Sequence, residues 1–235
     1  MLSIVSCICL TTHPKRVKFL PDAISSYRAQ EYPNKELVII NDGDPLPRID
    51  GALVINLPKR ENRWTIGEKR NAGVRMARGE FIATWDDDDI SLPNRLSEQV
   101  AYAAANDGDY VMADRMHISD ENMKIIGDCT RKAVTVKPVM PSALIRRSMI
   151  VRAGGYEALD YLEDMNILEK IRLLHRGNIL VIPNSNFYVV RRHGNNVTLG
   201  FGESTDEYAM CGMRGKYEIE AQRKVDAIRK SGIAI

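Results

Sequence analysis

The 235-residue sequence has few cysteines, and they do not form a recognisable framework. Its four cysteines are too few and too widely spaced for a disulfide scaffold or for the usual zinc motifs; they are Cys7, Cys9, Cys129 and Cys211. Cys7 and Cys9 stand two apart in a predicted strand and share one face, a spacing that disfavours a mutual disulfide. We therefore expect thiols in the protein core and a reducing compartment.

The sequence also lacks a long apolar run and an excess of either charge. No apolar stretch approaches the roughly 20 residues of a membrane span. The start "MLSIVSCICL" has neither a basic leader nor a small-residue cleavage site, so we expect no signal peptide. The 33 basic and 31 acidic side chains give a net charge of +2, which provides no general attraction to nucleic acid or membranes. We expect a cytoplasmic protein, with peripheral attachment to the inner face of the membrane as the alternative.

The first half of the chain alternates strand and helix patterns. Apolar, β-rich runs lie at 2–10, 36–43, 52–57 and 80–85, with helical periodicities near 17–27, 66–78 and 92–103. This repetition predicts an α/β fold with a mainly parallel sheet flanked by helices.

The second half is less regular. We expect paired strands at 109–118 and 122–128, a strand with a short helix at 141–156, and a helix from Glu163. Strands "ILVIP" and "FYVVRRH" follow, then a helical tail from about residue 205. The predicted organisation is one domain over 1–200, with a front half (1–105) and a back half (106–200), plus the tail 201–235.

Polar clusters follow three of the predicted strands. They are Thr11-Thr12, Asn41-Asp42 and the run Asp86-Asp87-Asp88-Asp89. Ligands of open α/β sheets bind beyond the carboxyl ends of the strands, so these clusters should meet in one crevice.

Four consecutive aspartates need an explanation, because like charges repel each other. A helix-capping run explains one or two of them. A calcium loop lacks the expected alternation, central glycine and terminal glutamate. A divalent cation shared with a phosphate ligand needs only a few carboxylates. A tight turn after the strand should point Asp86 and Asp88 to the same side.

Four segments, in this order, resemble family 2 glycosyltransferases of the GT-A fold. They are "LSIVSCICLTTHPKRVKFLPDAISSYRAQEYPNKELVIINDGD", "IGEKRNAGVRMARGEFIATWDDDDISLPNRL", "AGGYEALDYLEDMNILEKIRLLHRG" and "FYVVRRHGNN". The resemblance extends from residue 2 to about 197. It implies a Rossmann-like sheet with a smaller mixed sheet on the acceptor side, and transfer of a sugar from a nucleoside diphosphate, foremost UDP, with Mn²⁺ or Mg²⁺.

The resemblance also assigns the metal site. It makes Asp88 the metal carboxylate and places Asp86 and Asp87 at the ribose or a metal-bound water, with Asp86 as a further candidate ligand. His193 matches the family's carboxy-terminal ligand, although a single histidine on a strand is more often structural.

On the nucleotide side, Asp42 matches the acid that contacts the base, and Thr11 lies where a loop borders it. The chain departs from the family pattern at Asn41, where many relatives carry an aspartate. Arg60, Lys69 and Arg70 are candidates to face the diphosphate; the alternative is a solvated helix face.

The pair Glu163-Asp164 matches the family's "ED" motif. Asp164 is then the base that takes the acceptor's proton, and Glu163 positions it. A plain helix N-terminus is the alternative, and such a terminus should lower the pKa of Asp164. A base opposite the leaving group implies inversion. Trp85 should be core, whereas Trp64 could stack on a sugar or base or anchor a lid.

Two further interpretations and several acceptors stay open. A nucleotidyltransferase would show a glycine-rich loop, which "LTTHPKR" is not, and a binding module without catalysis would not need the Asp run, the ED pair and His193 together. The acceptor can be a glycan, a lipid-linked oligosaccharide, a protein or a hydroxylated base in phage-type DNA. For DNA, a basic stripe is expected, with Arg131, Lys132, Lys137, Arg146, Arg147 and Arg152 as candidates. The tail is a candidate for homo-oligomer formation.

Overall fold

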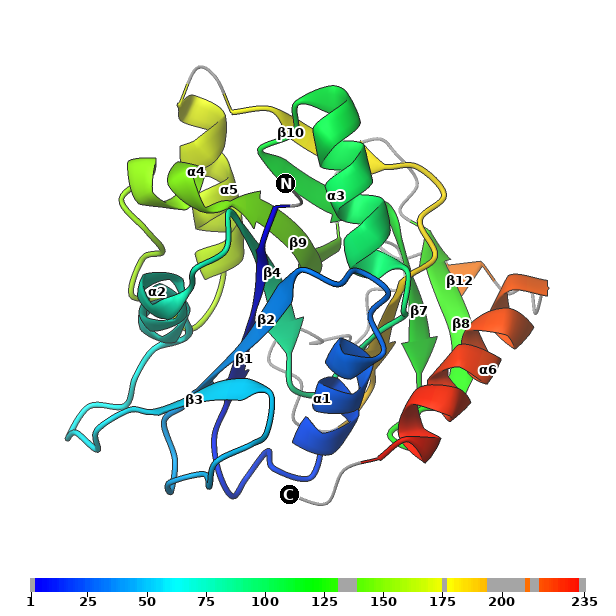
Figure 1. The fold of residues 1–235 in the computed structure, drawn as a ribbon, viewed down its shortest axis with the longest axis horizontal. Helices are drawn as coiled ribbons and strands as arrows, with labels where there is room; N and C mark the ends of the chain where they lie inside the picture. The colour runs from blue at the N-terminus through cyan, green and yellow to red at the C-terminus, as the bar shows by residue number, and fades with distance from the viewer. Residues whose placement is uncertain (1–2, 131–138, 175–176, 194–209, 212–215, 233–235) are drawn as a thin grey trace.

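A computed structural model of the chain describes residues 3–130, 139–174, 177–193, 210–211 and 216–232. A seven-stranded sheet forms its centre, in the order β10-β6-β9-β4-β1-β2-β3 (Figure 1). All neighbouring pairs in this sheet are parallel except the two made by β9. The strands are β1 (Val5–Thr11), β2 (Lys35–Asn41), β3 (Ala52–Asn56), β4 (Phe81–Asp86), β6 (Tyr110–Ala113), β9 (Val139–Arg146) and β10 (Ile179–Ile182).

Helices cover both faces of this sheet, and alternate side chains of each strand enter two different cores. Cys7 and Cys9 of β1 lie in the core with α1 (Leu20–Arg28) and α3 (Arg95–Asn106). Ile8, between them, lies in the core with α2 (Ile66–Met76), α4 (Arg147–Arg152) and α5 (Glu163–Leu173). The predicted placement of the two thiols on one buried face is therefore confirmed.

A second, five-stranded sheet has the order β12-β8-β7-β11-β5. It is mixed, because β11 runs parallel to β7 while the other pairs are antiparallel. Its strands are β5 (Ile90–Ser91), β7 (Arg115–Ser119), β8 (Ile125–Thr130), β11 (Tyr188–Arg191) and β12 (Met210–Cys211). Side chains of β8 around Cys129, and of Cys211, lie outside the described residues. The predicted fold class, a mainly parallel sheet with a smaller mixed sheet, is confirmed.

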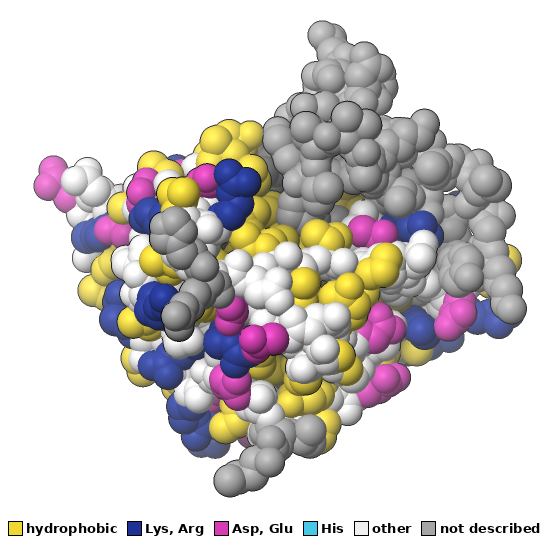
Figure 2. Space-filling model, turned by 90° about the horizontal axis from the view of Figure 1, so that it is seen from above, with side chains coloured by type: hydrophobic (Ala, Val, Ile, Leu, Met, Phe, Trp, Pro, Cys, Tyr) yellow, Lys and Arg dark blue, Asp and Glu magenta, His cyan; other side chains and the backbone are white. Residues whose placement is uncertain are grey.

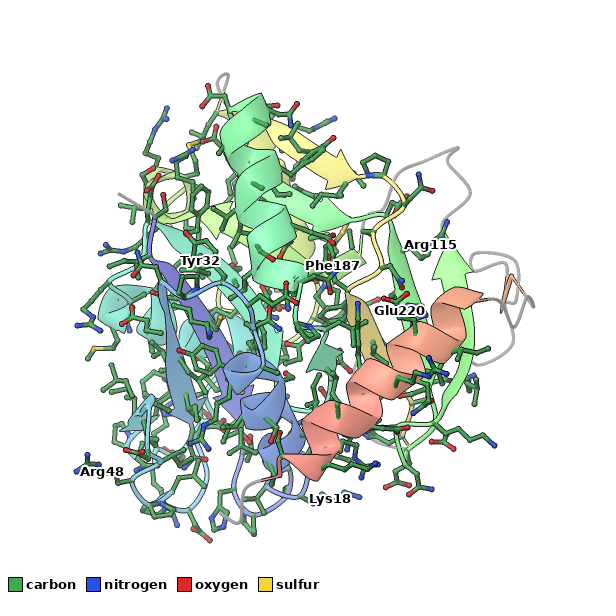
Figure 3. All side chains as sticks on the ribbon, turned by 45° about the vertical axis from the view of Figure 1, so that its right-hand side comes forward. Lys18, Tyr32, Arg48, Arg115, Phe187 and Glu220 are labelled. Carbon is green, nitrogen blue, oxygen red and sulfur yellow. The ribbon has the colours of Figure 1, made fainter. Side chains whose placement is uncertain are left out.

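The two sheets are joined directly behind the aspartate run. β5 follows the aspartates and pairs with β11, which leads to His193. Phe187, just before β11, is fully buried and lies inward of α3 in Figure 3. The side-chain amide of Gln30 donates to the carbonyls of Ser91 and Leu92 at 3.2 and 2.8 Å, and its oxygen accepts from the Leu96 amide at 3.1 Å. Gln30 therefore fixes the exit of the chain from the aspartates into α3.

The tail helix α6 (Lys216–Lys230) packs on the same chain, against α1 and β8 (Figures 1 and 3). Ala221, Val225 and Ile228 are buried there, and Arg229 approaches Asp22 of α1 with Nε 3.4 Å from a carboxylate oxygen. This apolar face is occupied within the chain, so an oligomer through α6 would have to use the helix's outer side. That oligomer stays a prediction, as does the division at residues 105 and 200. Among the described residues, no helix has the length and apolarity that crossing a bilayer requires.

Candidate active site

The three polar clusters lie side by side at one edge of the large sheet. β1 is hydrogen-bonded between β2 and β4, with Thr11 opposite Asn41 and Leu10 opposite Asp86. Because these strands are parallel, their carboxyl ends share an edge. This register confirms the expectation that the three clusters lie together.

Arg16, in the loop between β1 and α1, is the main positive partner of the aspartate run. Its Nε and Nη2 lie 2.8 and 2.6 Å from Oδ1 of Asp87, and its Nη2 also lies 2.5 Å from Oδ2 of Asp88. Burial raises the pKa of Asp87, and the hydrogen bond and charge of Arg16 oppose that rise. Asp87 and Asp88, which are neighbours, thus share one guanidinium. That Asp86 and Asp88 point to the same side stays a prediction; in the structure Asp86 ends β4 and its main cationic neighbour is Arg70, not Arg16.

His193 reaches the same carboxylate from the second sheet. Its Nε2 lies 2.8 Å from Oδ2 of Asp88, and its ring stacks on Phe19 with a centroid distance of 4.5 Å. Burial disfavours the charge of Asp88, but the hydrogen bond from His193 and the contacts of Arg16 outweigh it and lower the pKa of that carboxyl. Asp88 is therefore held as a carboxylate between two basic side chains.

Asp86 faces α2 instead. Nη2 of Arg70 lies 4.0 Å from its carboxylate, and Nε of the same arginine donates to Oε1 of Glu163 at 3.0 Å. Burial raises the pKa of Asp86 to about 6; Arg70 opposes the rise, and Asp88 and Asp87 add to it. Arg70 therefore connects the aspartate run to the ED pair at the start of α5.

Asp89 turns into the protein. It accepts hydrogen bonds from the Tyr188 hydroxyl at 2.8 Å and the Arg191 amide at 2.9 Å. Burial raises its pKa well above the ordinary value, and Asp88 and Asp86 add to the rise. Beneath the run, the fully buried Arg95 donates to Ser91, Gln99 and the carbonyl of Thr84. Asp89 and Arg95 are structural members of the cluster.

A pocket of about 370 Å³ opens beside the ends of β1 and β2. Asp42 is one of its lining residues; it accepts from the Thr12 hydroxyl at 2.6 Å and pairs with Lys69 of α2 at 3.2 Å. Thr12, rather than the predicted Thr11, lines the pocket; Thr11 is 1% exposed. The remaining lining residues are His13, Pro14, Lys15, Gly43, Asp44, Lys59, Arg60, Glu61, Arg63 and Trp64.

Arg60 and Trp64 form one wall of this pocket. The guanidinium of Arg60 lies 3.8 Å from the indole centroid and pairs with Glu68, which also completes the capping box of α2 with Thr65. The indole N–H donates to the carbonyl of Pro58 at 3.0 Å. Trp85, by contrast, is 2% exposed and lies in the core, as predicted.

Asn41, the departure from the family pattern, organises the turn after β2. Its side-chain oxygen accepts from the amides of His13 and Gly43 at 3.0 and 3.1 Å, and its amide donates to the Asp44 carbonyl and to Asn56 Oδ1, both at 2.8 Å. The two donated bonds require an amide, because a carboxylate has no donor. Asparagine is therefore the residue that this turn needs.

The ED pair sits at the start of α5, held against α2. Glu163 is 5% exposed and bound to Arg70, whereas Asp164 accepts from the Met165 amide at 2.7 Å. Burial raises the pKa of Asp164, and Glu163 adds to the rise while Arg70 opposes it. The predicted lowering by the helix N-terminus is wrong, because burial and the adjacent carboxylate have the larger effect.

The preceding loop is fixed by the first turn of α2 and by the segment just before that helix. The Gly67 amide donates to the Leu159 carbonyl at 3.0 Å, and Asp160 accepts from Arg63 at 2.7 Å. A Cβ on Gly67 would stand 1.7 Å from the Glu157 carbonyl oxygen, so this close approach requires glycine.

The described side chains supply only some of the ligands that a divalent cation needs. Two ligands of one octahedral ion with bonds of about 2.1 Å stand about 3 Å apart, and His193 and Asp88 are separated by 2.8 Å. These two side chains therefore fit a shared ion. Within the described ranges, however, no three His, Cys, Asp or Glu side chains are grouped to hold a metal. The protein ligands are thus few, as they are where substrate phosphates complete the shell.

The three members of the candidate basic stripe that the structure describes lie at another edge of the sheet. Arg146 is opposite Phe81 at the beginning of β4, and Arg147 and Arg152 line a separate pocket there with Gly79 and Glu80. Arg146 is also neutralised by Glu80 and Asp109. Figure 2 shows basic and acidic side chains interspersed on the face seen from above. The other three candidates, Arg131, Lys132 and Lys137, lie outside the described residues.

Sequence reasoning missed Arg16, Phe19 and Arg95. Arg16 carried a usable signal, since it is a cation in the loop that leaves the same sheet edge as the aspartates. Phe19 and Arg95 carried none, because their roles depend on how the two sheets meet.

The fold is that of the GT-A glycosyltransferases. The chain belongs to glycosyl transferase family 2, whose family model matches residues 7–137. It is 24% identical over 218 residues to an uncharacterized glycosyltransferase of Methanocaldococcus jannaschii, covering 78% of this chain and 73% of that protein. It is 32% identical over 104 residues to the putative glycosyltransferase EpsH of Bacillus subtilis, covering 41% and 29%.

Solved structures share the fold. TarS residues 1–349 of S. aureus in complex with UDP-GlcNAc aligns with a TM-score of 0.59 and 15% identity, covering 99% of this chain and 68% of that one. The mannosyltransferase PcManGT of Pyrobaculum calidifontis in complex with GDP-Man and Mn²⁺ aligns with a TM-score of 0.57 and 16% identity, covering 82% and 57%. This chain thus spans little more than half of PcManGT.

Proposed function

We propose that this chain transfers a sugar from a UDP-sugar to an acceptor hydroxyl with inversion and with the help of Mn²⁺ or Mg²⁺. The observation that carries the proposal is Arg70, which approaches Asp86 at 4.0 Å and Glu163 at 3.0 Å. This contact brings the acids of the donor side and the ED pair to one edge of the sheet. The UDP-GlcNAc complex of TarS and the GDP-Man and Mn²⁺ complex of PcManGT support a nucleotide-sugar donor.

The nucleoside would occupy the pocket beside β2. Asp42 offers carboxylate oxygens to an N–H of the base and is held in place by Thr12 and Lys69. Trp64 and Arg60 form a flat wall suited to a ring. The diphosphate would lie between this pocket and the aspartates, where Lys69 and Arg70 supply positive charge.

Asp88 and His193 are the residues that would hold the cation, which stabilises the negative charge of a leaving diphosphate as a Lewis acid. Asp164 accepts the proton of the acceptor hydroxyl. The hydroxyl oxygen forms a bond to the anomeric carbon while the bond from that carbon to the phosphate oxygen breaks, and the nucleoside diphosphate leaves. Arg70 holds Glu163, and through it the start of α5, so that Asp164 faces the incoming hydroxyl.

The acceptor that we propose is a glycan or a lipid-linked oligosaccharide. The hydroxylated base of phage-type DNA is less well supported, because Arg146, Arg147 and Arg152 lie at the opposite edge of the sheet. A protein acceptor would use the same chemistry.

The test is release of UDP from a panel of UDP-sugars, with GDP-mannose for comparison, in the presence of Mn²⁺ or Mg²⁺. Asp88→Asn should weaken donor binding, whereas Asp164→Asn should bind UDP normally and lose turnover by about 10²-fold or more. Asp50→Asn, at an exposed turn, is the matched control. Undiminished turnover in Asp164→Asn would refute the proposed base.

A further inference from the structure

Arg16 contacts the same oxygen of Asp88 as His193 does. Its Nη2 lies 2.5 Å from Oδ2 of Asp88, and His193 Nε2 lies 2.8 Å from the same oxygen. Both contacts therefore converge on one atom. The Asp88 side chain is only 10% exposed, so this oxygen has little further space for a ligand.

Arg16 makes more contacts with Asp87 than with Asp88. Nε and Nη2 both lie within 2.8 Å of Oδ1 of Asp87, and Nε lies 3.1 Å from Oδ2. The side chain of Asp87 is 2% exposed, and that of Arg16 is 24% exposed. The single contact with Asp88 is therefore the one that a cation can displace, by drawing the Asp88 carboxylate away from Nη2, while Asp87 still holds Arg16.

We propose that Arg16 is a resident counter-cation that competes with the divalent cation for Asp88, so that metal binds well only together with the nucleoside diphosphate. This inference rests on the proposed function and names a positioning residue within that site. Arg16 neutralises Asp87 and Asp88 when no donor is bound, which answers how the aspartate run is tolerated. Two protein side chains do not fill the coordination shell of the metal. The phosphates of the donor supply further ligands, so that the metal binds more tightly and displaces Arg16 from Asp88.

If Arg16 competes with the cation for Asp88, its removal has an effect that removal of a purely structural residue would not have. Removing Arg16 should improve metal binding, because it frees a carboxylate and removes a positive charge next to it. A residue that only stabilises the fold would leave metal affinity unchanged or weaken it when removed.

The experiment measures Mn²⁺ binding to the full chain by the electron paramagnetic resonance signal of free Mn²⁺, with and without UDP. Arg16→Gln should bind Mn²⁺ without UDP about tenfold more tightly than the wild type, with a smaller difference once UDP is saturating. Arg16→Lys keeps a charge without the paired contact, and its affinity should fall in between.

The matched control is Arg78→Gln, which also removes an arginine and frees a carboxylate, since Arg78 pairs with Glu36 at 2.8 Å at the surface. Its Mn²⁺ affinity should equal that of the wild type. The proposal is overturned if Arg16→Gln binds Mn²⁺ no better than the wild type, or if Arg78→Gln shows the same gain. If Arg16→Gln does not fold, the proposal is overturned when Arg16→Lys binds Mn²⁺ with the same affinity as the wild type.

The proposed function has its own readout in these data. Wild-type protein that fails to bind Mn²⁺ even with UDP would contradict the proposed metal-dependent donor site. A gain in Arg16→Gln in the same experiment would still show the competition at Asp88.

Discussion

The four aspartates after β4 illustrate how identical side chains take different states. Asp88, bound by Arg16 and His193, has a lowered pKa, whereas Asp89, inside the protein, has a strongly raised one. Asp86 lies between these extremes, with a pKa of about 6. The partners around each carboxyl, and not the residue type, decide which of them is ionised.

The ionised Asp86 side chain should lower the free energy of unfolding when no metal is bound. Its pKa of about 6 in the folded chain is above the ordinary 3.8, so wild-type stability should fall as pH rises between these values and stay reduced above them. In chelator at pH 7, Asp86→Asn should raise the free energy of unfolding by about 1–3 kcal/mol. Urea unfolding at several pH values measures this. If Asp86→Asn increases the free energy of unfolding by the same amount at pH 4 and pH 7, ionisation of the buried Asp86 is not the cause of the increase.

Arg70 should set the acid limb of the pH–rate profile. The pKa of Asp164 is raised by burial and by Glu163, and Arg70 opposes the rise. A base must be ionised, so activity should fall as pH drops through this raised pKa. Arg70→Gln removes the opposing charge and should move the acid limb of kcat upward by about one pH unit. The control is Arg75→Gln on the exposed side of α2. An acid limb that stays in place or moves downward would be inconsistent with this role.

At the scale of elements, the periodicity of the first half predicted the parallel strands and their helices because each strand is buried on both faces. The pairing across "SDE" was predicted in part: β7 pairs with β8, but the single strand predicted at 109–118 is two strands, and β6 belongs to the large sheet. Strand order was not predictable: β9 enters the large sheet antiparallel between β4 and β6. The partners of the site residues depend on that assembly, which is why the contacts of Arg16 and Phe19 were missed. The roles of Asp88, His193 and Asp42 stay predictions.

The loop before α5 should depend on Gly67. A methyl group there would meet the Glu157 carbonyl at 1.7 Å, which displaces the backbone leading to Glu163 and Asp164. Gly67→Ala should therefore lower turnover by about ten- to a hundredfold. The Kd for UDP, measured by calorimetry, should change much less, and Arg75→Ala on the same helix should change neither. Normal turnover in Gly67→Ala would show that the loop adapts without cost.

Considered as a whole, the molecule has two chemically different sheet edges. The carboxyl ends of β1, β2 and β4 carry the acids and the pocket with Asp42, while the opposite edge carries Arg147 and Arg152 in a pocket with Gly79. The second sheet contributes His193 to the first edge, through β11. Chemistry should therefore be confined to one edge.

Charge removal at the opposite edge tests this separation. The double variant Arg147→Gln/Arg152→Gln should retain kcat and the acceptor KM within about twofold, since surface changes away from a site have small effects. Steady-state kinetics with the acceptor found by screening measures both constants. A large rise in the acceptor KM would indicate that part of the acceptor binds at this edge, and it would favour DNA as the acceptor.

Binding of a nucleotide-sugar donor and its cation at the aspartate edge is the claim on which the proposed chemistry depends. Anomalous diffraction from crystals soaked with Mn²⁺ and UDP locates the ion and the nucleotide together. We expect a manganese peak within bonding distance of Asp88 and His193, with the base in the pocket at Asp42. A manganese and UDP site away from these residues would contradict that claim.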